Sequence, residues 1–97
     1  MIQRTVLIKF NETTTQEQLQ EVIKRFKALK DKLSGIVEIQ AGFNLAEKSK
    51  EYPVVLMVRF EDQAALDAYV ANADHQAVAL FIRESGRVDS IGVDIEI

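Results

Sequence analysis

The sequence predicts an α+β fold with the element order βαββαβ. Four segments alternate apolar and polar residues with the period of two that is typical of strands. Between them lie two regions whose apolar residues recur at spacings of three and four, which is typical of helices packed on one face. Two strand–helix–strand units that share one sheet give the ferredoxin-like arrangement, a four-stranded antiparallel sheet with its helices on one face.

The first strand is expected at residues 2–10, where β-branched residues are frequent. A helix is expected at residues 15–33, and a capping box at Thr14 or Thr15 can begin it. Gly35 is placed to end this helix in a left-handed conformation. The apolar stripe that the helix would bury consists of Leu19, Val22, Ile23, Phe26, Leu29 and Leu33.

The middle of the chain predicts two more strands. Residues 36–45 alternate apolar with polar side chains, a polar loop follows at residues 46–51, and a third strand covers residues 53–61. Pro53 fits the first position of that strand, where its missing N–H has the least effect on strand pairing.

The last part of the chain predicts two short helices and a strand. A second helix is expected from Asp62, a favourable N-cap residue, to about Ala71. A short third helix then begins at about His75 with Asp74 as its cap, and a final strand covers residues 88–97. We expect the second helix to bury Leu66, Tyr69 and Val70, and the third to bury Val78, Phe81 and Ile82.

Length and composition limit the classes of protein to which the chain can belong. With 97 residues, 47% of them hydrophobic, we expect a single globular domain covering residues 1–97. The absence of cysteine excludes disulfides and thiolate chemistry, and a net charge of −3 disfavours nucleic acid as a partner. The longest apolar run, residues 54–58, is far shorter than the ~20 residues that span a bilayer. Because no secretory signal is recognisable either, we expect a cytoplasmic protein that does not insert into a membrane.

The predicted third strand is apolar on both faces. Its residues Val54, Leu56, Val58 and Phe60 point one way, whereas Val55 and Met57 point the other. Two helices cover only one side of a four-stranded sheet, and a free face should carry polar residues. We therefore predict a homodimer in which two copies pack their sheets face to face. The alternative is a monomer that binds an apolar ligand on this face.

Three polar residues are candidates for chemistry: His75, Tyr69 and Arg4. His75 is the only histidine, and its ring should be mostly neutral at the start of a helix, so it can act as a base or can simply cap and pack. The Tyr69 hydroxyl can bond to His75, or to backbone or solvent. Arg4 either lines a cleft with these two residues and binds a carboxylate or phenolate oxygen, or extends to solvent at the end of the sheet.

The sequence predicts no bound cofactor and no metal site. A single histidine cannot form a multi-histidine metal site, and no local cluster of carboxylates calls for an ion. No glycine-rich phosphate loop precedes a helix, and no serine lies in a recognisable nucleophile elbow.

Two segments resemble the stress-responsive A/B-barrel (Dabb) domain family. Residues 1–10, MIQRTVLIKF, are similar to the family's opening M-I-x-H-x-V-L-F-K-F. Residues 58–78 are similar to its motif F-x-(D/S)-x-x-A-(L/I)-x-x-Y-x-x-x-P-x-H, with Tyr69 and His75 at the spacing of the motif. The turn at residues 42–44 also fits, so the resemblance covers nearly the whole chain.

This resemblance implies a ferredoxin-like fold whose sheets pair into a dimeric α/β barrel. Most members of the family have no established activity, some plant members are linked to stress tolerance, and one type is a polyketide cyclase with histidine and tyrosine in a cleft between sheet and helices. Tyr69 and His75 match the tyrosine and histidine of that cyclase. Its first-strand histidine, third-strand histidine and first-helix tyrosine are replaced here by Arg4, Val54 and Phe26.

Three functional interpretations follow. The first is a homodimeric small-molecule-binding or stress-associated protein of unestablished activity, which binds a small apolar or aromatic ligand. The second is a cofactor-independent lyase, cyclase or isomerase acting on a small aromatic or keto acid, with His75 as the base and Tyr69 orienting or protonating the substrate. The third is a cofactor-independent monooxygenase of the same fold. The predicted ligand-binding residues are Arg4, Phe26, Val54, Leu56 and Phe81, although bulky side chains among them can instead fill the cleft.

Overall fold

The elements follow the order strand, helix, strand, strand, helix, helix, strand along residues 1–97, all of which are described by a computed structural model. The strands are β1 (Ile2–Phe10), β2 (Ile36–Phe43), β3 (Val54–Phe60) and β4 (Arg87–Glu96). The α-helices are α1 (Gln16–Lys27), α2 (Gln63–Ala71) and α3 (Ala73–Glu84), and two short 3-10 helices cover Ala28–Asp31 and Glu47–Ser49. The predicted ferredoxin-like fold is confirmed, with α2 and α3 together in the second helical position.

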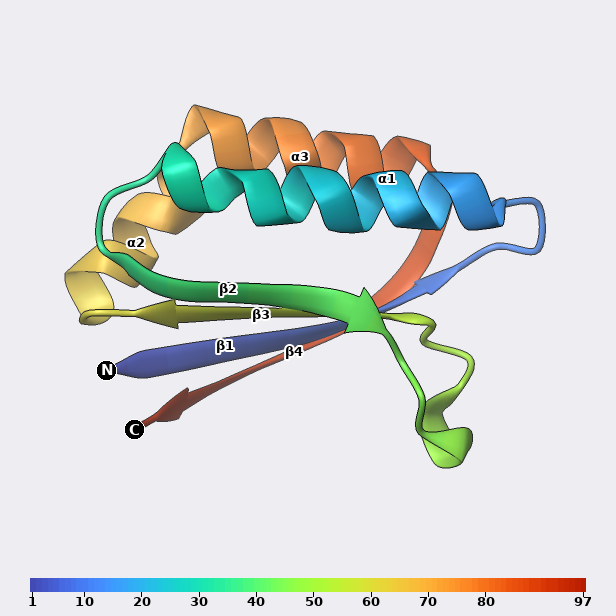
Figure 1. Ribbon diagram of the computed structural model, residues 1–97, viewed down its shortest axis with the longest axis horizontal. Helices are drawn as coiled ribbons and strands as arrows, with labels where there is room; N and C mark the ends of the chain where they lie inside the picture. The colour runs from blue at the N-terminus through green and yellow to red at the C-terminus, as the bar shows by residue number, and fades with distance from the viewer.

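The four strands form one sheet in the order β2-β3-β1-β4, and every neighbouring pair is antiparallel. The helices cover one face of this sheet and leave the other free (Figure 1). The strand register places Arg4 of β1 between Val58 of β3 and Asp94 of β4. Further along β1, Ile8 pairs with Ser90 of β4. These two rows of residues mark the two ends of a cleft on the helix-facing side.

Two helix starts that the sequence predicts from capping residues are confirmed. At the start of α1, Thr15 Oγ1 accepts a hydrogen bond from the backbone N–H of Gln18 at 3.2 Å, and Gln18 Oε1 accepts one from the N–H of Thr15 at 2.7 Å. At the start of α2, Asp62 accepts a hydrogen bond from the backbone N–H of Ala65 at 2.9 Å. Each cap satisfies a donor that the first helical turn leaves free, and such caps contribute about 1 kcal/mol.

The junction between α2 and α3 differs from the prediction. Helix α3 begins at Ala73, not at about His75, because Asn72 caps it in place of Asp74. The Asn72 side-chain oxygen accepts hydrogen bonds from the backbone N–H of Asp74 at 2.7 Å and of His75 at 3.3 Å. A single extended residue therefore separates the two helices. As a result Tyr69, in the last turn of α2, lies next to His75, in the first turn of α3.

Other boundaries and one burial prediction also differ. The helix expected to end at residue 33 is α-helical only to Lys27 and then continues as a 3-10 helix. Strand β2 ends at Phe43, short of the predicted residue 45. Val70 is 46% exposed instead of buried, because the buried stripe of α2 follows Leu66 and Tyr69, three residues apart. None of the α-helices has the length and apolarity needed to cross a membrane.

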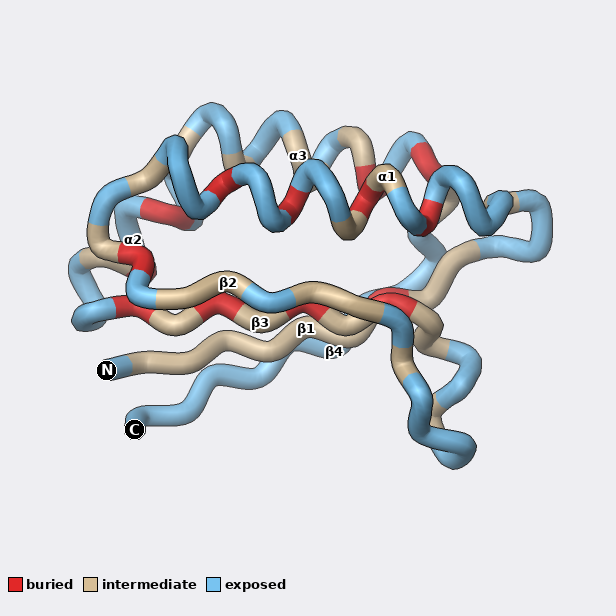
Figure 2. Tube along the Cα trace, in the orientation of Figure 1, coloured by how far each residue is buried: buried red, intermediate tan, exposed pale blue.

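The hydrophobic core lies between the sheet and the helices, where thirteen buried residues form one cluster. Burial alternates along β3, where Val54, Leu56, Val58 and Phe60 are at most 4% exposed and the residues between them are not buried. The buried positions lie on the helix-facing side of β3 and on the inner sides of the helices (Figure 2). Strand β4, by contrast, has no buried residue along its whole length. The helices therefore seal the sheet over β3 and leave it open toward β4.

The outer face of the sheet, opposite the helices, is apolar across its centre. Its apolar residues are Leu7, Val55, Met57, Ile91, Val93 and Ile95. The register places Leu7 between Val55 and Ile91, so the apolar patch is continuous across three strands. The three residues on β4 are each about half exposed. The predicted apolar character of both faces of β3 is confirmed, and it extends to β1 and β4.

Candidate functional site

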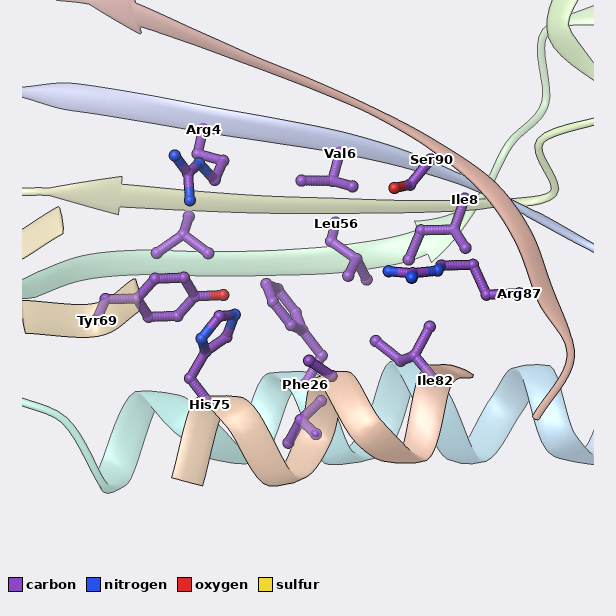
Figure 3. Close-up of a pocket in the computed structure, with 13 residues that line it drawn as sticks. Arg4, Val6, Ile8, Phe26, Leu56, Tyr69, His75, Ile82, Arg87 and Ser90 are labelled. Atoms are coloured by element: carbon purple, nitrogen blue, oxygen red, sulfur yellow. The ribbon is translucent and has the colours of Figure 1, made fainter. Parts of the chain in front are cut away.

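A cleft of about 140 Å³ opens between the helix-facing side of the sheet and the helices (Figure 3). The sheet supplies Arg4, Val6, Ile8, Leu56, Val58, Arg87 and Ser90, and the helices supply Phe26, Tyr69, His75, Val78, Ala79 and Ile82. Nine of these thirteen residues are hydrophobic. Apolar walls with a few polar groups are the usual composition of a site for a small molecule.

The lining follows from the periodicity of two elements. Alternate residues of β1 face the helices, and these are Arg4, Val6 and Ile8. Residues of α3 at spacings of three and four face the sheet, and these are His75, Val78, Ala79 and Ile82. The apolar residues of both sets lie between two polar ends, one at the start of α3 and the other at the start of β4 (Figure 3).

Tyr69 and His75 form the first polar end. Their rings pack against each other with centroids 4.0 Å apart and an angle of 34° between the planes. Tyr69 is held from its other side by the ring of Phe60, whose centroid lies 5.0 Å away in an edge-to-face contact. The Tyr69 hydroxyl lies beside the imidazole at this end of the cleft, and it makes no hydrogen bond within the chain (Figure 3). A ligand in the cleft would meet this hydroxyl directly.

The environment of this end favours the neutral form of both residues. Burial lowers the pKa of His75 below its ordinary value of 6.5, and the charge of Arg4 lowers it further, while the backbone carbonyls of Val70 and Tyr69 act in the opposite direction. The sequence predicts the same neutral ring from the helix dipole, and in the structure burial is the first cause of the lowered pKa of His75. Burial also raises the pKa of Tyr69 to about 12, against the opposing effect of Arg4. At neutral pH the cleft thus offers an imidazole base beside a phenolic donor.

One nitrogen of His75 has no hydrogen bond. Nδ1 is buried without a partner, and such unsatisfied polar atoms are rare in folded proteins. Nε2 makes no hydrogen bond within the chain either, and the ring lines the cleft. The ring packs on Tyr69, and the backbone carbonyls of Val70 and Tyr69 lie close enough to raise its pKa, so His75 both holds the junction of α2 and α3 and lines the cleft.

Arg4 lines the cleft, but its charge is already paired. Its Nε and one terminal nitrogen donate to the two carboxylate oxygens of Asp94 at 2.8 and 3.0 Å. The hydrogen bond from Arg4 lowers the pKa of Asp94, and the same bond raises the pKa of Arg4. Of the two alternatives for Arg4, the structure favours the cleft over solvent. The carboxylate that it binds, however, belongs to the chain itself.

The structure brings five of the seven predicted site residues into the lining of the cleft, namely Arg4, Phe26, Leu56, Tyr69 and His75. Val54 and Phe81 lie outside it. Val54 has no exposed surface, since the helices cover the sheet at this position. Phe81 points toward α1, where the guanidinium of Arg25 lies 3.7 Å from the centre of its ring. These two predicted residues therefore do not line the cleft.

Sequence reasoning missed the second polar end, formed by Arg87 and Ser90 of β4, and it missed Asp94. All three lie on the polar face of the last strand, and their positions depend on the register between β1 and β4. Ala79 and Ile82 follow His75 by four and seven residues in α3, and this helical spacing could have identified them as lining residues of the cleft. No group of three or more histidine, cysteine, aspartate or glutamate side chains lies close enough together to hold a metal ion.

The fold and the cleft define a class of protein: a ferredoxin-like α+β protein with a largely apolar cleft between its sheet and helices. Within this class, the chain belongs to the Stress Responsive A/B Barrel Domain (Dabb) family, whose sequence model matches residues 2–97. The resemblance stated from the opening strand and the Tyr69–His75 spacing is thus confirmed. No curated protein matches the chain.

Several solved structures share the fold over almost the whole chain. A dimeric ferredoxin-like protein of unknown function from Jannaschia sp. CCS1 is 27% identical, with a TM-score of 0.84, covering 99% of this chain and 98% of its own. A dimeric ferredoxin-like protein of unknown function from Thermobifida fusca is 21% identical, with a TM-score of 0.86 and coverage of 99% and 90%. A hydroxynitrile lyase from Passiflora edulis is 12% identical, with a TM-score of 0.84 and coverage of 99% and 92%.

Proposed function

We propose that the protein is a homodimer whose subunits each bind a small, largely apolar molecule in the cleft between sheet and helices. The observation that carries this proposal is the His75 end of the cleft. There a neutral imidazole without an internal partner lies beside a protonated Tyr69, at the edge of an apolar space. The second nitrogen of the ring, Nε2, has no hydrogen-bond partner in the chain, so it can bond to a ligand in the cleft that the ring lines.

The size of the cleft limits the ligand. An apolar cavity of about 150 Å³, engineered into another protein, holds one benzene molecule. The volume here, about 140 Å³, therefore suits a body of one six-membered ring. Larger cofactors such as haem or a dinucleotide exceed this space several-fold. A small aromatic or alicyclic molecule with one oxygen function near Tyr69 and His75 fits the walls and the polar end.

The homodimer is supported by the outer face of the sheet. Leu7, Val55 and Ile91 form a row of apolar side chains that no helix covers. Contiguous exposed apolar patches mark interaction sites, and a second copy of the same face is the simplest cover. Two solved relatives with the same fold are described as dimeric. Dimerisation through this face would leave the cleft on the opposite side of the sheet accessible.

Proton transfer is a second candidate function, favoured by the protonation states at the first polar end. In this reaction His75 Nε2 takes a proton from a carbon next to a carbonyl group. The electron pair of the broken C–H bond moves to the carbonyl oxygen, and the Tyr69 hydroxyl stabilises the resulting enolate by a hydrogen bond. Return of the proton at either end of the enolate completes an isomerisation. A hydroxynitrile lyase from Passiflora edulis has the same fold, so this architecture accommodates an enzyme.

A thermal-shift screen with small aromatic and keto acids tests the binding function. We expect a bound compound to raise the melting temperature of the wild type, and to raise that of His75→Ala and Tyr69→Phe less. Tyr52→Phe is the matched control, because Tyr52 lies in the loop before β3 and bonds to Asp89, away from the cleft. Equal shifts in all variants, or no shift with any compound, would contradict binding in this cleft.

Deuterium exchange separates binding from catalysis. Phenylpyruvate carries exchangeable protons next to its keto group, and proton NMR in heavy water follows their loss. If His75 is a base, the wild type accelerates this exchange above the buffer rate and His75→Ala does not. Binding of phenylpyruvate with exchange at the buffer rate would leave the protein as a binding module and remove the second candidate.

A further inference from the structure

We propose that Arg87 is the anion-binding residue of the cleft, and that the ligand is a small carboxylic acid with an apolar ring. Its carboxylate would lie against Arg87 and Ser90, and its ring would extend toward Tyr69 and His75. This inference rests on the proposed binding function, because it assigns the class of ligand to the same cleft.

Three of the five arginines have a carboxylate partner. Arg4 pairs with Asp94, Arg25 with Glu21 and Arg59 with Glu38. Arg83 and Arg87 form no ion pair with any carboxylate of the chain. Only one of these two, Arg87, lines the cleft. The single uncompensated cation of the cleft is therefore at the end opposite His75.

Local structure directs Arg87 into the cleft. Gly86 has a φ of +109°, a conformation that favours glycine, and it makes the sharp turn from α3 into β4. The register between β1 and β4 shifts next to Phe10, so that Arg87 pairs with Phe10 on the helix-facing side. From there its guanidinium reaches back toward Leu56, between Ile8 and Ile82 (Figure 3).

The surroundings of Arg87 offer a donor, and no carboxylate of the chain lies within ion-pair distance of its guanidinium. Ser90, three residues further along β4, also lines the cleft, and its hydroxyl has no partner in the chain. Asp89 belongs to the other face of the strand, where it pairs with Lys9 in the register and accepts a hydrogen bond from the Tyr52 hydroxyl. A planar guanidinium with a free hydroxyl beside it matches the geometry of a carboxylate.

The apolar stretch between the two ends sets the shape of the rest of the ligand. The rows of Arg4 and Ile8 are four residues apart on β1, which corresponds to roughly 13 Å along the strand. Val6, Leu56 and Phe26 line the space between them. These walls provide no partner for a sugar or a phosphate chain. A ring joined to a carboxylate by a short chain fits the distance and the charge, with the ring in the apolar cleft and the carboxylate at the exposed end formed by Arg87 and Ser90.

The test compares hydrocinnamate with hydrocinnamyl alcohol, which has the same ring and chain without the charge. Titrations followed by NMR or calorimetry would use the wild type, Arg87→Gln and Arg83→Gln. Arg83 is the matched control, because it is an exposed arginine without an ion pair that lies outside the cleft. We expect the wild type and Arg83→Gln to prefer the acid by about tenfold, and Arg87→Gln to bind both compounds equally, since a charge-assisted hydrogen bond has this order of effect.

The outcomes separate this inference from the function on which it rests. If both compounds bind in the cleft and Arg87→Gln keeps the preference for the acid, Arg87 is not the anion site, while the binding function stands. If neither compound binds the wild type, both are overturned. Unchanged binding of the alcohol to Arg87→Gln shows that the variant keeps the cleft intact, so a lost preference reports the charge alone.

Discussion

Both faces of the sheet carry apolar residues, but these residues are arranged differently. On the helix-facing side, β3 is sealed by the helices, and the space toward β4 remains as a cleft with polar groups at both ends. On the outer face, the row of Leu7, Val55 and Ile91 is apolar across three strands, and in the next row Thr5 lies between Met57 and Val93. An apolar cleft with polar ends suits a small ligand, whereas a largely apolar open face suits a partner protein.

The largest effect should come from a charge in the centre of the outer face. Leu7→Glu would place two unpaired carboxylates in the proposed interface, one from each subunit. Burial of an unpaired charge costs about 3–5 kcal/mol, so we expect the dimer dissociation constant to rise at least about a thousandfold. Sedimentation measures this change. Gln20→Glu, the same charge on the exposed side of α1, is the control.

The same experiment can contradict the assignment of the two faces. If Leu7→Glu remains as dimeric as Gln20→Glu, the outer face is not the interface. If the wild type itself sediments as a monomer at micromolar concentration, no dimer forms through either face. Circular dichroism of Leu7→Glu checks that the subunit still folds when it is alone.

Valine-to-alanine substitutions on the two faces of β3 should have a smaller effect, which is measured on the free energy of unfolding. Val58 is 1% exposed in the core, and Val55 lies on the outer face of the same strand. We expect Val58→Ala to lower the free energy of unfolding by about 2–3 kcal/mol at every protein concentration, because it leaves a cavity in the core. The loss from Val55→Ala should grow with protein concentration, since it weakens the dimer and not the subunit. Urea unfolding at several concentrations distinguishes the two, and equal, concentration-independent losses would contradict the account.

The smallest effect is the dependence of the free energy of unfolding on pH through His75. In the unfolded chain His75 titrates near 6.5, and burial lowers its pKa in the folded protein. Above this pH the ring is neutral in both states and the stability does not depend on it. As the pH falls below 6.5, only the unfolded chain readily takes up the proton, so the free energy of unfolding falls until the folded pKa is passed. Urea unfolding between about pH 7.5 and 5 should show this decline in the wild type and not in His75→Gln.

The sequence alone was enough to predict which strand residues lie on which face of the sheet, because the alternation of side chains along a strand is a local property. Val58 and Val55 were assigned to opposite faces from their neighbours alone, and the structure agrees. The pairing of Tyr69 with His75 was also predictable, since both lie within seven residues of one another around a single break between helices. Their exact arrangement depended on Asn72, which the sequence alone could not rank above Asp74, because both residue types cap helices equally well.

The rest of the site depends on contacts between distant parts of the chain. Arg4 and Asp94 are 90 residues apart, and only the strand order and register bring them together. Arg87 enters the cleft through a register shift next to Phe10 that has no local signal. Phe81 was assigned to the cleft, whereas its neighbour Ile82 lines the cleft and Phe81 contacts Arg25 of α1, because the phase of a short helix is uncertain by one residue. One residue rotates a side chain by about 100° around the helix axis.

The titration of His75 by NMR tests the central claim most directly, because the chain has a single histidine and so gives one imidazole signal. The account predicts a midpoint below 6.5 in the free protein, and a clear change of the imidazole signal when hydrocinnamate is added. A midpoint at or above 6.5, with a signal that saturating hydrocinnamate leaves unchanged, would show an ordinary solvated histidine and contradict a ligand site at this end of the cleft.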